Sequence, residues 1–272
     1  MADSQYKNYI FDFYGTLVDI WTDEDDEKLW KRMAALYAAY GADYSAAELK
    51  ANYDNHIKRQ ENQLRKRSQL EHVEVDLVVV FIELLLEAPH KHATDSIILD
   101  LETWGNLIAQ TFRMLSRKKL QAYENTLATL KILKEAGATV ILLSNAQRAF
   151  TKAEIEMTGC REFLDKIYIS SDYKMKKPQV EFMNLVLNDN QLNPEETVMV
   201  GNDFTSDMAI AQAAGIDGIL LNTFPYNQSE IETLNTMNVK VIEDISELVG
   251  CGESGINKRR RSLFSILSSF RI

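Results

Sequence analysis

After about residue 120, the sequence alternates between short apolar segments and segments in which apolar residues recur with helical period. The predicted elements are a helix at 124–136 that ends before Gly137, a strand at 139–143, a helix at 149–157, a strand at 166–169, a helix at 179–188, a strand at 197–200, a helix at 205–213, a strand at 218–221, a helix at 229–236, a strand at 239–242 and a helix at 244–249. Alternation of this kind is typical of βαβ units, which form a parallel sheet with helices on both faces. We therefore expect a doubly wound, Rossmann-like α/β fold.

One more strand is predicted far upstream, a short apolar segment that begins at Tyr9, ends at Asp12 and is followed by a turn signal at Gly15. Between this strand and the alternating part, apolar residues recur only at helical spacing. The helices expected there run from Thr22 to Gly41, from a capping box at Ser45 and Glu48 to about Leu64, from Val73 to Glu87 and from Asp95 to Leu115. We therefore expect a core formed by residues 1–19 and 121–250, an all-helical cap at 20–120 inserted after the first strand, and a C-terminal tail at 251–272.

Composition excludes several classes of protein. Apolar residues make up 46% of the 272 residues and charged residues 26%, which is ordinary for a globular protein. The most apolar segment, 77–86, is interrupted by Glu83 and is far shorter than the roughly 18 residues that a membrane span needs. The N-terminus has no apolar signal core, and two cysteines 91 positions apart form no disulfide or zinc pattern. We expect a cytoplasmic protein that does not bind membranes.

The net charge of −10 is unevenly distributed. The segment 258–272 holds five basic residues and no acid, so residues 1–257 carry a net charge of −15. This negative charge argues against nucleic acid as a partner, because clustered Lys and Arg side chains supply most of a protein's affinity for a polyanion. In the tail, helical spacing of apolar residues permits a basic amphipathic helix, but 15 residues form only a marginal isolated helix, and a frayed terminus is the favoured interpretation. The expected partner is a small-molecule substrate, and the sequence does not indicate an oligomeric state.

Polar residues cluster where four of the predicted strand regions end. These places are Asp12 to Thr16, Ser144-Asn145, Lys177 before Pro178, and Gly201 to Asp207. In open parallel sheets, ligands bind outside the carboxyl ends of the strands, so these segments are expected to meet in one site. An aspartate there can act as a nucleophile through an aspartyl ester, and Asp12 is the candidate. Lys177 would supply a point charge and Ser144 a hydrogen-bond donor to a transferred phosphoryl group.

In order and context, these four segments resemble the motifs of the haloacid dehalogenase superfamily of hydrolases, which place a helical cap after the first strand. The resemblance covers about residues 6–250 and implies Asp12 as the nucleophile. It further implies substrate or phosphate binding by Thr16, Ser144, Asn145 and Lys177. The cofactor it implies is Mg²⁺, held by Asp12, Asp203, Asp207 and the main-chain carbonyl of Tyr14.

Two departures from the superfamily pattern bear on function. Superfamily phosphatases have a second aspartate, the general acid and base, where this sequence has Tyr14; the 2-haloacid dehalogenases have tyrosine there, and a halide leaves without a proton. In the fourth motif, the position of the first metal carboxylate is Asn202, so either Asp203 replaces it or the metal site is weakened. We expect a Mg²⁺-dependent phosphatase of small phosphomonoesters, with Tyr14 as a compromised acid. The alternatives are a 2-haloacid dehalogenase-like hydrolase and a catalytically weak binding or regulatory member of the superfamily.

Overall fold

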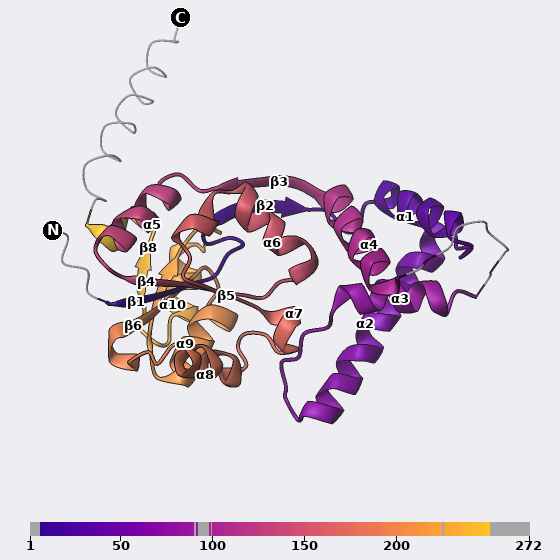
Figure 1. Ribbon diagram of the computed structural model, residues 1–272. Coiled ribbons are helices and arrows are strands. Elements are labelled where there is room, and N and C mark those ends of the chain that lie inside the picture. Colours follow the sequence, from indigo (N-terminus) through magenta and orange to yellow (C-terminus); the bar gives the residue numbers. More distant parts are fainter. Residues whose placement is uncertain (1–5, 90, 92–97, 99, 225, 251–272) are drawn as a thin grey trace, which may run out of the picture.

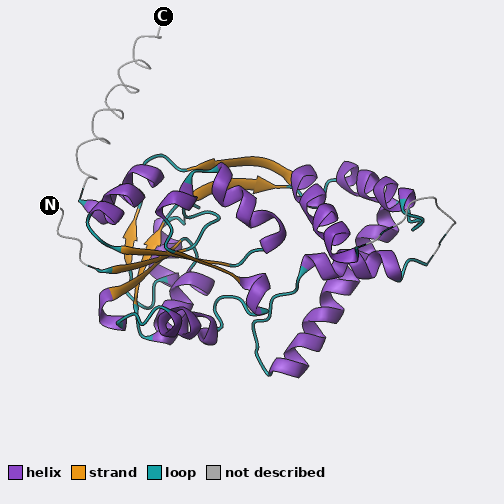
Figure 2. Ribbon diagram, in the orientation of Figure 1, coloured by secondary structure: helices purple, strands orange, loops and turns teal. Residues whose placement is uncertain are grey.

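A computed structural model describes residues 6–89, 91, 98, 100–224 and 226–250; the predicted tail lies outside this set. The described chain forms an α/β core and a helical part that projects from one side of it (Figure 1). In the core, a parallel sheet lies between two layers of helices, and a two-stranded ribbon runs from the core toward the helical part (Figure 2). The predicted doubly wound α/β fold with a helical insertion after the first strand is confirmed.

The core sheet has six parallel strands in the order β5-β4-β1-β6-β7-β8. Its strands are β1 (Asn8–Phe11), β4 (Thr139–Ser144), β5 (Lys166–Ile169), β6 (Thr197–Gly201), β7 (Asp217–Leu221) and β8 (Lys240–Ile242). The strand order reverses at β1, which pairs with β4 on one side and with β6 on the other. This reversal opens a crevice at the carboxyl ends of β1, β4 and β6, where ligands bind in folds of this kind.

Buried apolar residues on both faces of the sheet explain why its strands read as continuous apolar runs. In β1, Tyr9 and Phe11 pack on one face, and Ile10 packs on the other. The core helices are α5 (Thr126–Glu135), α6 (Arg148–Met157), α7 (Ser170–Tyr173), α8 (Val180–Asp189), α9 (Ala209–Ala214) and α10 (Gln228–Leu234). Helices α5 and α6 cover the first face, and α8 and α9 cover the second.

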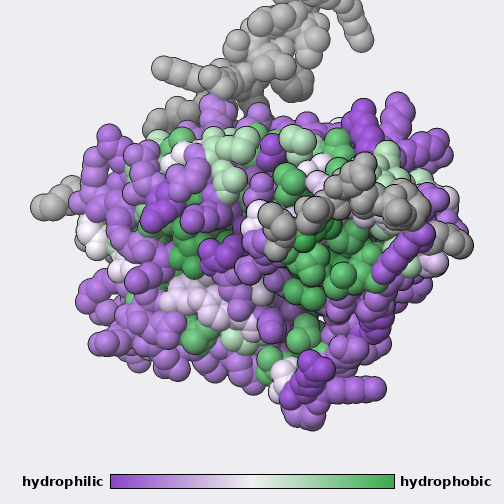
Figure 3. Space-filling view, turned by 45° about the vertical axis from the view of Figure 1, so that its right-hand side comes forward, coloured by the Kyte–Doolittle hydropathy of each residue, from purple (hydrophilic) through white to green (hydrophobic). Residues whose placement is uncertain are grey.

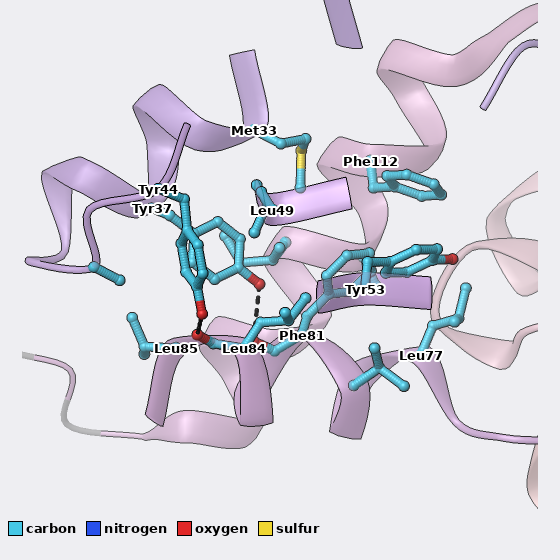
Figure 4. Packing of buried hydrophobic residues seen from close by; sticks show 14 of the residues in the cluster. Met33, Tyr37, Tyr44, Leu49, Tyr53, Leu77, Phe81, Leu84, Leu85 and Phe112 are labelled. Carbon is cyan, nitrogen blue, oxygen red and sulfur yellow. Dashed lines mark hydrogen bonds between the residues drawn. The ribbon is translucent and has the colours of Figure 1, made fainter. Parts of the chain in front are cut away.

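In the part of the insertion that the structure describes, four helices surround an aromatic centre. They are α1 (Glu27–Ala39), α2 (Ala46–Ser68), α3 (Leu77–Leu86) and α4 (Leu101–Ser116). The rings of Tyr53, Phe81 and Phe112 lie within 5.6 Å of one another, centroid to centroid. Figure 4 shows these rings together with the hydroxyls of Tyr37 and Tyr44, which donate to main-chain carbonyls of α3. The cap therefore has its own hydrophobic core.

The most apolar segment of the sequence forms α3 at the centre of this cap. Its side chains are mostly buried, but Val79 and Leu86 are exposed, as are Leu107 and Met114 on α4. On the face seen with the cap forward, apolar and hydrophilic side chains lie in adjoining areas (Figure 3). No helix in the described part of the chain is long and apolar enough to cross a bilayer.

The sequence did not predict the ribbon between core and cap. Strand β2 (Val18–Thr22) pairs antiparallel with β3 (Arg117–Ala122), and the predicted borders at 19/20 and 120/121 fall inside these two strands. Strand β3 is half-exposed and rich in basic residues, so it lacks the apolar run by which the core strands are recognised. The regular elements in the described part of the insertion are thus helices, apart from the two strands by which the chain leaves and re-enters the core.

Several helix ends differ from the prediction because a capping aspartate lies further along the chain. Helices α1, α3 and α4 begin later than expected, directly after Asp26, Asp76 and Asp100. Each of these aspartates is the N-cap, because its side chain accepts a main-chain N–H of the first turn. The predicted helix at 205–213 begins as a π-helical turn (Phe204–Met208), and the one at 244–249 is a 3₁₀ helix (Ile245–Val249). The capping box of Ser45 and Glu48 is present as predicted.

Candidate active site

A buried lysine joins two of the sequence motifs at the carboxyl edge of the sheet. Lys177 Nζ lies 2.8 Å from Asp12 Oδ1 and 2.7 Å from Asp207 Oδ1. Lys177 is 3% exposed and Asp207 is fully buried. We call Asp12, Lys177 and Asp207 the ion triad; with two carboxylates and one ammonium, it carries a formal charge of −1.

Burial and charge act on the triad in opposite directions. Burial alone would lower the pKa of Lys177, but Asp12 and Asp207 outweigh it and raise that pKa above its ordinary value of 10.5. Burial raises the pKa of Asp207 to about 6, although Lys177 acts in the other direction. The ammonium therefore remains charged at neutral pH and is the main group that keeps Asp207 ionised there.

Asp207 is fixed by the loop that follows β6. Its Oδ2 accepts the main-chain N–H groups of Asn202 (3.0 Å) and Asp203 (3.1 Å). A Cβ atom at Gly201 would lie 2.3 Å from Asp207 Cγ, so only glycine permits this approach. The glycine of the fourth motif is thus required by packing against its last aspartate.

Asn145 positions the lysine from the neighbouring strand. Its Oδ1 accepts the main-chain N–H of Lys177 (2.8 Å), and its Nδ2 donates to the carbonyl of Lys177 (3.0 Å). Both polar ends of the amide are therefore used within the protein. Beside it, Ser144 Oγ is buried and has no hydrogen-bond partner among the described residues. A buried hydroxyl of this kind calls for a ligand or a water as partner.

The structure places Asn202, and not Asp203, against the first motif. Thr16 Oγ1 lies 3.2 Å from Asn202 Oδ1, and a Cβ at Gly15 would touch the Asn202 side chain. Asp203 Oδ1 instead accepts the N–H groups of Thr205 (2.5 Å) and Ser206 (3.2 Å), as an N-cap. One carboxylate oxygen of Asp203 is therefore committed to the local helical turn.

The Tyr14 hydroxyl is not available as a proton donor to a substrate. Its hydroxyl donates to Glu154 and also lies 3.0 Å from Thr151 Oγ1. Burial, with the nearby Glu154 charge, raises the pKa of Tyr14 well above 10. The hydroxyl proton is thus both engaged and hard to remove at neutral pH. Asp19, the other acid near the first motif, pairs with Lys119 on the ribbon.

Glu154 is the centre of a buried network that the sequence did not reveal. Its carboxylate lies 2.8 and 3.0 Å from Arg113 Nε and Nη2, and 2.7 Å from Arg117 Nη1. Glu154 is 1% exposed; burial alone would raise its pKa, but the two guanidiniums hold it below its usual value. The network joins Tyr14 and α6 of the core to α4 of the cap and to β3. Its only sequence signal is a glutamate on the apolar face of a predicted helix, next to Ile155.

A cavity of about 340 Å³ lies between core, ribbon and cap, next to these motifs. It is lined from the core by Tyr14, Asn145, Ala146, Gln147 and Phe150, from the ribbon and the segment after it by Ile20, Thr22 and Glu24, and from the cap by Glu74, Leu77 and Arg113. A volume in this range suits a small organic ligand. The cavity holds two predicted site residues, Tyr14 and Asn145, in its wall.

Oxygen atoms that could hold a metal ion come from the first and fourth motifs. Asp12 contributes a carboxylate whose Oδ1 contacts Lys177, and the carbonyl of Tyr14 and Asn202 Oδ1 are further oxygen donors of the same motifs. Three ligand atoms of His, Cys, Asp or Glu converge, within the described ranges, only in the cap, at His56, Glu83 and Glu87. Mg²⁺ accepts one or two carboxylates and completes its shell with water and substrate phosphate. The donor set therefore fits a Mg²⁺ ion held by one carboxylate.

A family model described as haloacid dehalogenase-like hydrolase matches residues 9–221, which includes all four motifs. The chain belongs to this family. The predicted superfamily is thereby confirmed, and the chain is a hydrolase of the haloacid dehalogenase type.

Among characterised relatives, the chain is similar to phosphatases. It is 30% identical over 140 residues to the glyceraldehyde 3-phosphate phosphatase of Methanothermobacter thermautotrophicus, a match that covers 51% of this chain and 62% of that protein. It is 29% identical over 125 residues to the phosphoglycolate phosphatase of Vibrio cholerae, covering 46% of this chain and 54% of the relative. The matches thus span little more than half of the relatives' length.

Solved structures share the fold of this haloacid dehalogenase-like hydrolase. A 2-haloacid dehalogenase from Pseudomonas syringae superposes with a TM-score of 0.61 at 17% identity and covers 89% of this chain and 96% of that one. A phosphatase of the family from Thermococcus onnurineus gives a TM-score of 0.54 at 17% identity, over 89% and 95% of the two chains. A Bacillus subtilis relative, with a TM-score of 0.50 at 18% identity, over 90% and 97% of the two chains, was solved bound to magnesium.

The ion triad predicts a pH-dependent defect in Lys177→Met. Without the ammonium, Asp12 and Asp207 face each other as buried like charges, and we expect a loss of roughly 3–5 kcal/mol in the free energy of unfolding at pH 7. The pKa of Asp207, which burial already raises, then rises further, so the folded state binds a proton that the unfolded chain has already released, and the loss should be smaller at pH 5. Urea unfolding at both pH values measures this. Lys176→Met, at the adjacent half-exposed lysine, is the control, and an equal loss at both pH values would contradict the argument.

The Glu154 network predicts a large effect of Glu154→Gln. Glutamine keeps the volume but leaves the guanidinium of Arg113 buried without its counter-charge, which should cost about 3 kcal/mol of unfolding free energy. Glu156→Gln, on the same helix but exposed, should change it by less than about 0.5 kcal/mol. Chemical denaturation of both variants compares them, and similar values would show that Glu154 does not stabilise the core and cap contact.

Proposed function

We propose that this protein hydrolyses small phosphomonoesters in a Mg²⁺-dependent reaction through an aspartyl phosphate on Asp12. The observation that carries the proposal is the ion triad, which buries Asp12 next to a lysine at the strand edge where this fold binds ligands. The similarity to phosphatases in sequence supports it. The substrate is proposed to bind in the cavity between the core, residues 1–19 with 121–250, and the cap, residues 20–120.

In the first step, a carboxylate oxygen of Asp12 attacks phosphorus and the bond from phosphorus to the alcohol oxygen breaks. The alkoxide leaves and takes a proton from water. In the second step, water attacks the aspartyl phosphate, releasing inorganic phosphate and regenerating the Asp12 carboxylate. Lys177 supplies positive charge to the phosphoryl oxygens, and Ser144 Oγ, which lacks a protein partner, supplies a hydrogen bond.

Electrostatics explains why a metal is included. The ion triad has a formal charge of −1, and a phosphate dianion would add further negative charge to a buried site. Asp12, the carbonyl of Tyr14 and Asn202 would hold Mg²⁺, which neutralises phosphoryl oxygens when bound. Asp207 would act on the site indirectly, by orienting Lys177.

Among the described residues, the proposed site has no identified general acid that would protonate the leaving group. Because the Tyr14 hydroxyl is bound to Glu154, it does not protonate an alkoxide, and water has to do so. Esters whose leaving group needs no proton, such as p-nitrophenyl phosphate, should therefore react faster than alkyl phosphates. The same feature favours a second candidate function, metal-free hydrolysis of a 2-halo acid, because halide leaves without a proton.

The decisive experiment measures phosphate release from p-nitrophenyl phosphate and a panel of small phosphomonoesters, with Mg²⁺ or with EDTA. We expect turnover that requires Mg²⁺ and that falls by roughly 10³-fold or more in Asp12→Asn, which lacks the nucleophile. No release from any ester would refute the phosphatase proposal, and chloride release from 2-chloropropionate would then be measured. The absence of both phosphate and chloride release would favour a binding or regulatory role.

The placement of Asn202 predicts a gain of metal affinity. Asn202→Asp adds a second carboxylate facing the first motif, so the Mg²⁺ concentration for half-maximal activity should fall roughly tenfold. Asp203→Asn serves as the matched control, because Asp203 caps its own helical turn and its loss should leave that concentration within about twofold. The opposite pattern would assign the metal position to Asp203.

A further inference from the structure

The proposed substrate cavity is lined by two carboxylates, Glu74 and Glu24, that form no ion pair among the described residues. Glu74, a half-buried residue of the cap, accepts from Ser170 Oγ at 2.9 Å and more weakly from Gln147 Nε2 at 3.4 Å. Glu24 lies at the exposed rim of the same cavity. Neither carboxylate forms an ion pair among the described residues, although the charge of Lys176 acts on Glu74 and the charges of Arg113 and Lys50 act on Glu24. Two carboxylates thus line the cavity without an ion pair of their own.

The basic residue of the cavity wall is already neutralised. Arg113 is 7% exposed and gives Nε and Nη2 to Glu154. Its guanidinium also lies 4.6 Å from the ring centroid of Phe150 and 5.1 Å from that of Tyr14. The guanidinium of Arg113 is therefore engaged by Glu154 through its N–H groups and by two aromatic rings beside it. An anionic substituent on a ligand would meet Glu74 and Glu24 with little basic charge to bind it.

We infer that the substrate carries a positively charged ammonium group on the alcohol side of its phosphoester, and that Glu74, assisted by Glu24, recognises it. This inference rests on the proposed function, because it specifies the substrate class of the same site. An ammonium in the cavity would form charge-assisted hydrogen bonds with Glu74, which are stronger than neutral ones. A carboxylate on the ligand would instead be repelled by both acids.

Two further observations agree with a cationic ligand. Burial raises the pKa of Glu74 although Lys176 acts in the other direction, and a bound ammonium would offset part of that burial cost. The cavity volume of about 340 Å³ is at the small end of the range for ligand sites, which suits a short aminoalkyl phosphate. The phosphate would lie toward Lys177 and the ammonium toward the cap.

The test uses three phosphomonoesters of similar size that differ in charge: 2-aminoethyl phosphate, n-propyl phosphate and phosphoglycolate. Initial rates with Mg²⁺ give kcat/KM for each compound. Calorimetric titration of the Asp12→Asn protein with the same three compounds gives their affinities without turnover. We expect the order amine, then neutral, then carboxylate, with roughly tenfold or more between the first two, in line with one charge-assisted hydrogen bond.

Charge-only variants identify the groups responsible. Glu74→Gln retains an oxygen that can accept from Ser170 but removes the charge, and it should reduce the ratio of amine to propyl compound roughly tenfold. Glu24→Gln should reduce it by a smaller factor, because Glu24 is more exposed. Glu27→Gln makes the same change in net charge at an exposed residue that pairs with Lys31, and the ratio should not change.

The outcomes separate this inference from the proposed function. Hydrolysis of all three esters at equal rates, or a preference for phosphoglycolate, would overturn the inference and leave the phosphatase proposal standing. No hydrolysis, with the amine bound best in a Glu74-dependent manner, would overturn the phosphatase proposal and support a cationic ligand. An amine preference that persists in Glu74→Gln would overturn the role assigned to Glu74.

Discussion

The buried contact of Lys177 with Asp12 and Asp207 is the interaction on which the rest of the site depends. The Lys177 ammonium contacts two carboxylates, Asp12 directly after β1 and Asp207 in the helical turn that follows β6. Asn145, directly after β4, hydrogen-bonds the main chain of the lysine. Burying any of these charges alone would cost several kcal/mol of desolvation free energy, and their mutual attraction offsets that cost when they are buried together. Gly201 follows from the same constraint, since a side chain there would displace Asp207.

Tyr14 shows how one substitution in a motif changes what a site can do. With tyrosine in place of the second aspartate, the position no longer offers a carboxyl group to the cleft, and its hydroxyl joins Glu154, Arg113 and Arg117 instead. The position thus becomes part of a buried contact between core and cap. Membership of the hydrolase family is therefore compatible with a change in proton transfer, and the identity of the leaving group becomes the main chemical question.

Sequence reasoning predicted the elements of the core well, and the site less completely. The strands of the sheet were predicted within about two residues, because parallel strands buried on both faces are continuous apolar runs. The ribbon was missed because β3 is basic and half-exposed, and α1, α3 and α4 begin later than predicted because Asp26, Asp76 and Asp100 cap them. The network of Glu154 was missed because its members are far apart in the chain and belong to no motif.

The sequence by itself determined the α/β fold, the helical insertion, the family and the four motifs, because apolar periodicity and motif spacing are properties of neighbouring residues. Only the tertiary structure decided which of these polar residues meet. It directed Lys177 to Asp12 and Asp207, placed Asn202 against Thr16 while Asp203 caps a helical turn, and left Glu74 in the cavity wall without an ion pair among the described residues. These outcomes depend on distances between segments up to about 200 residues apart, which periodicity and local spacing do not encode.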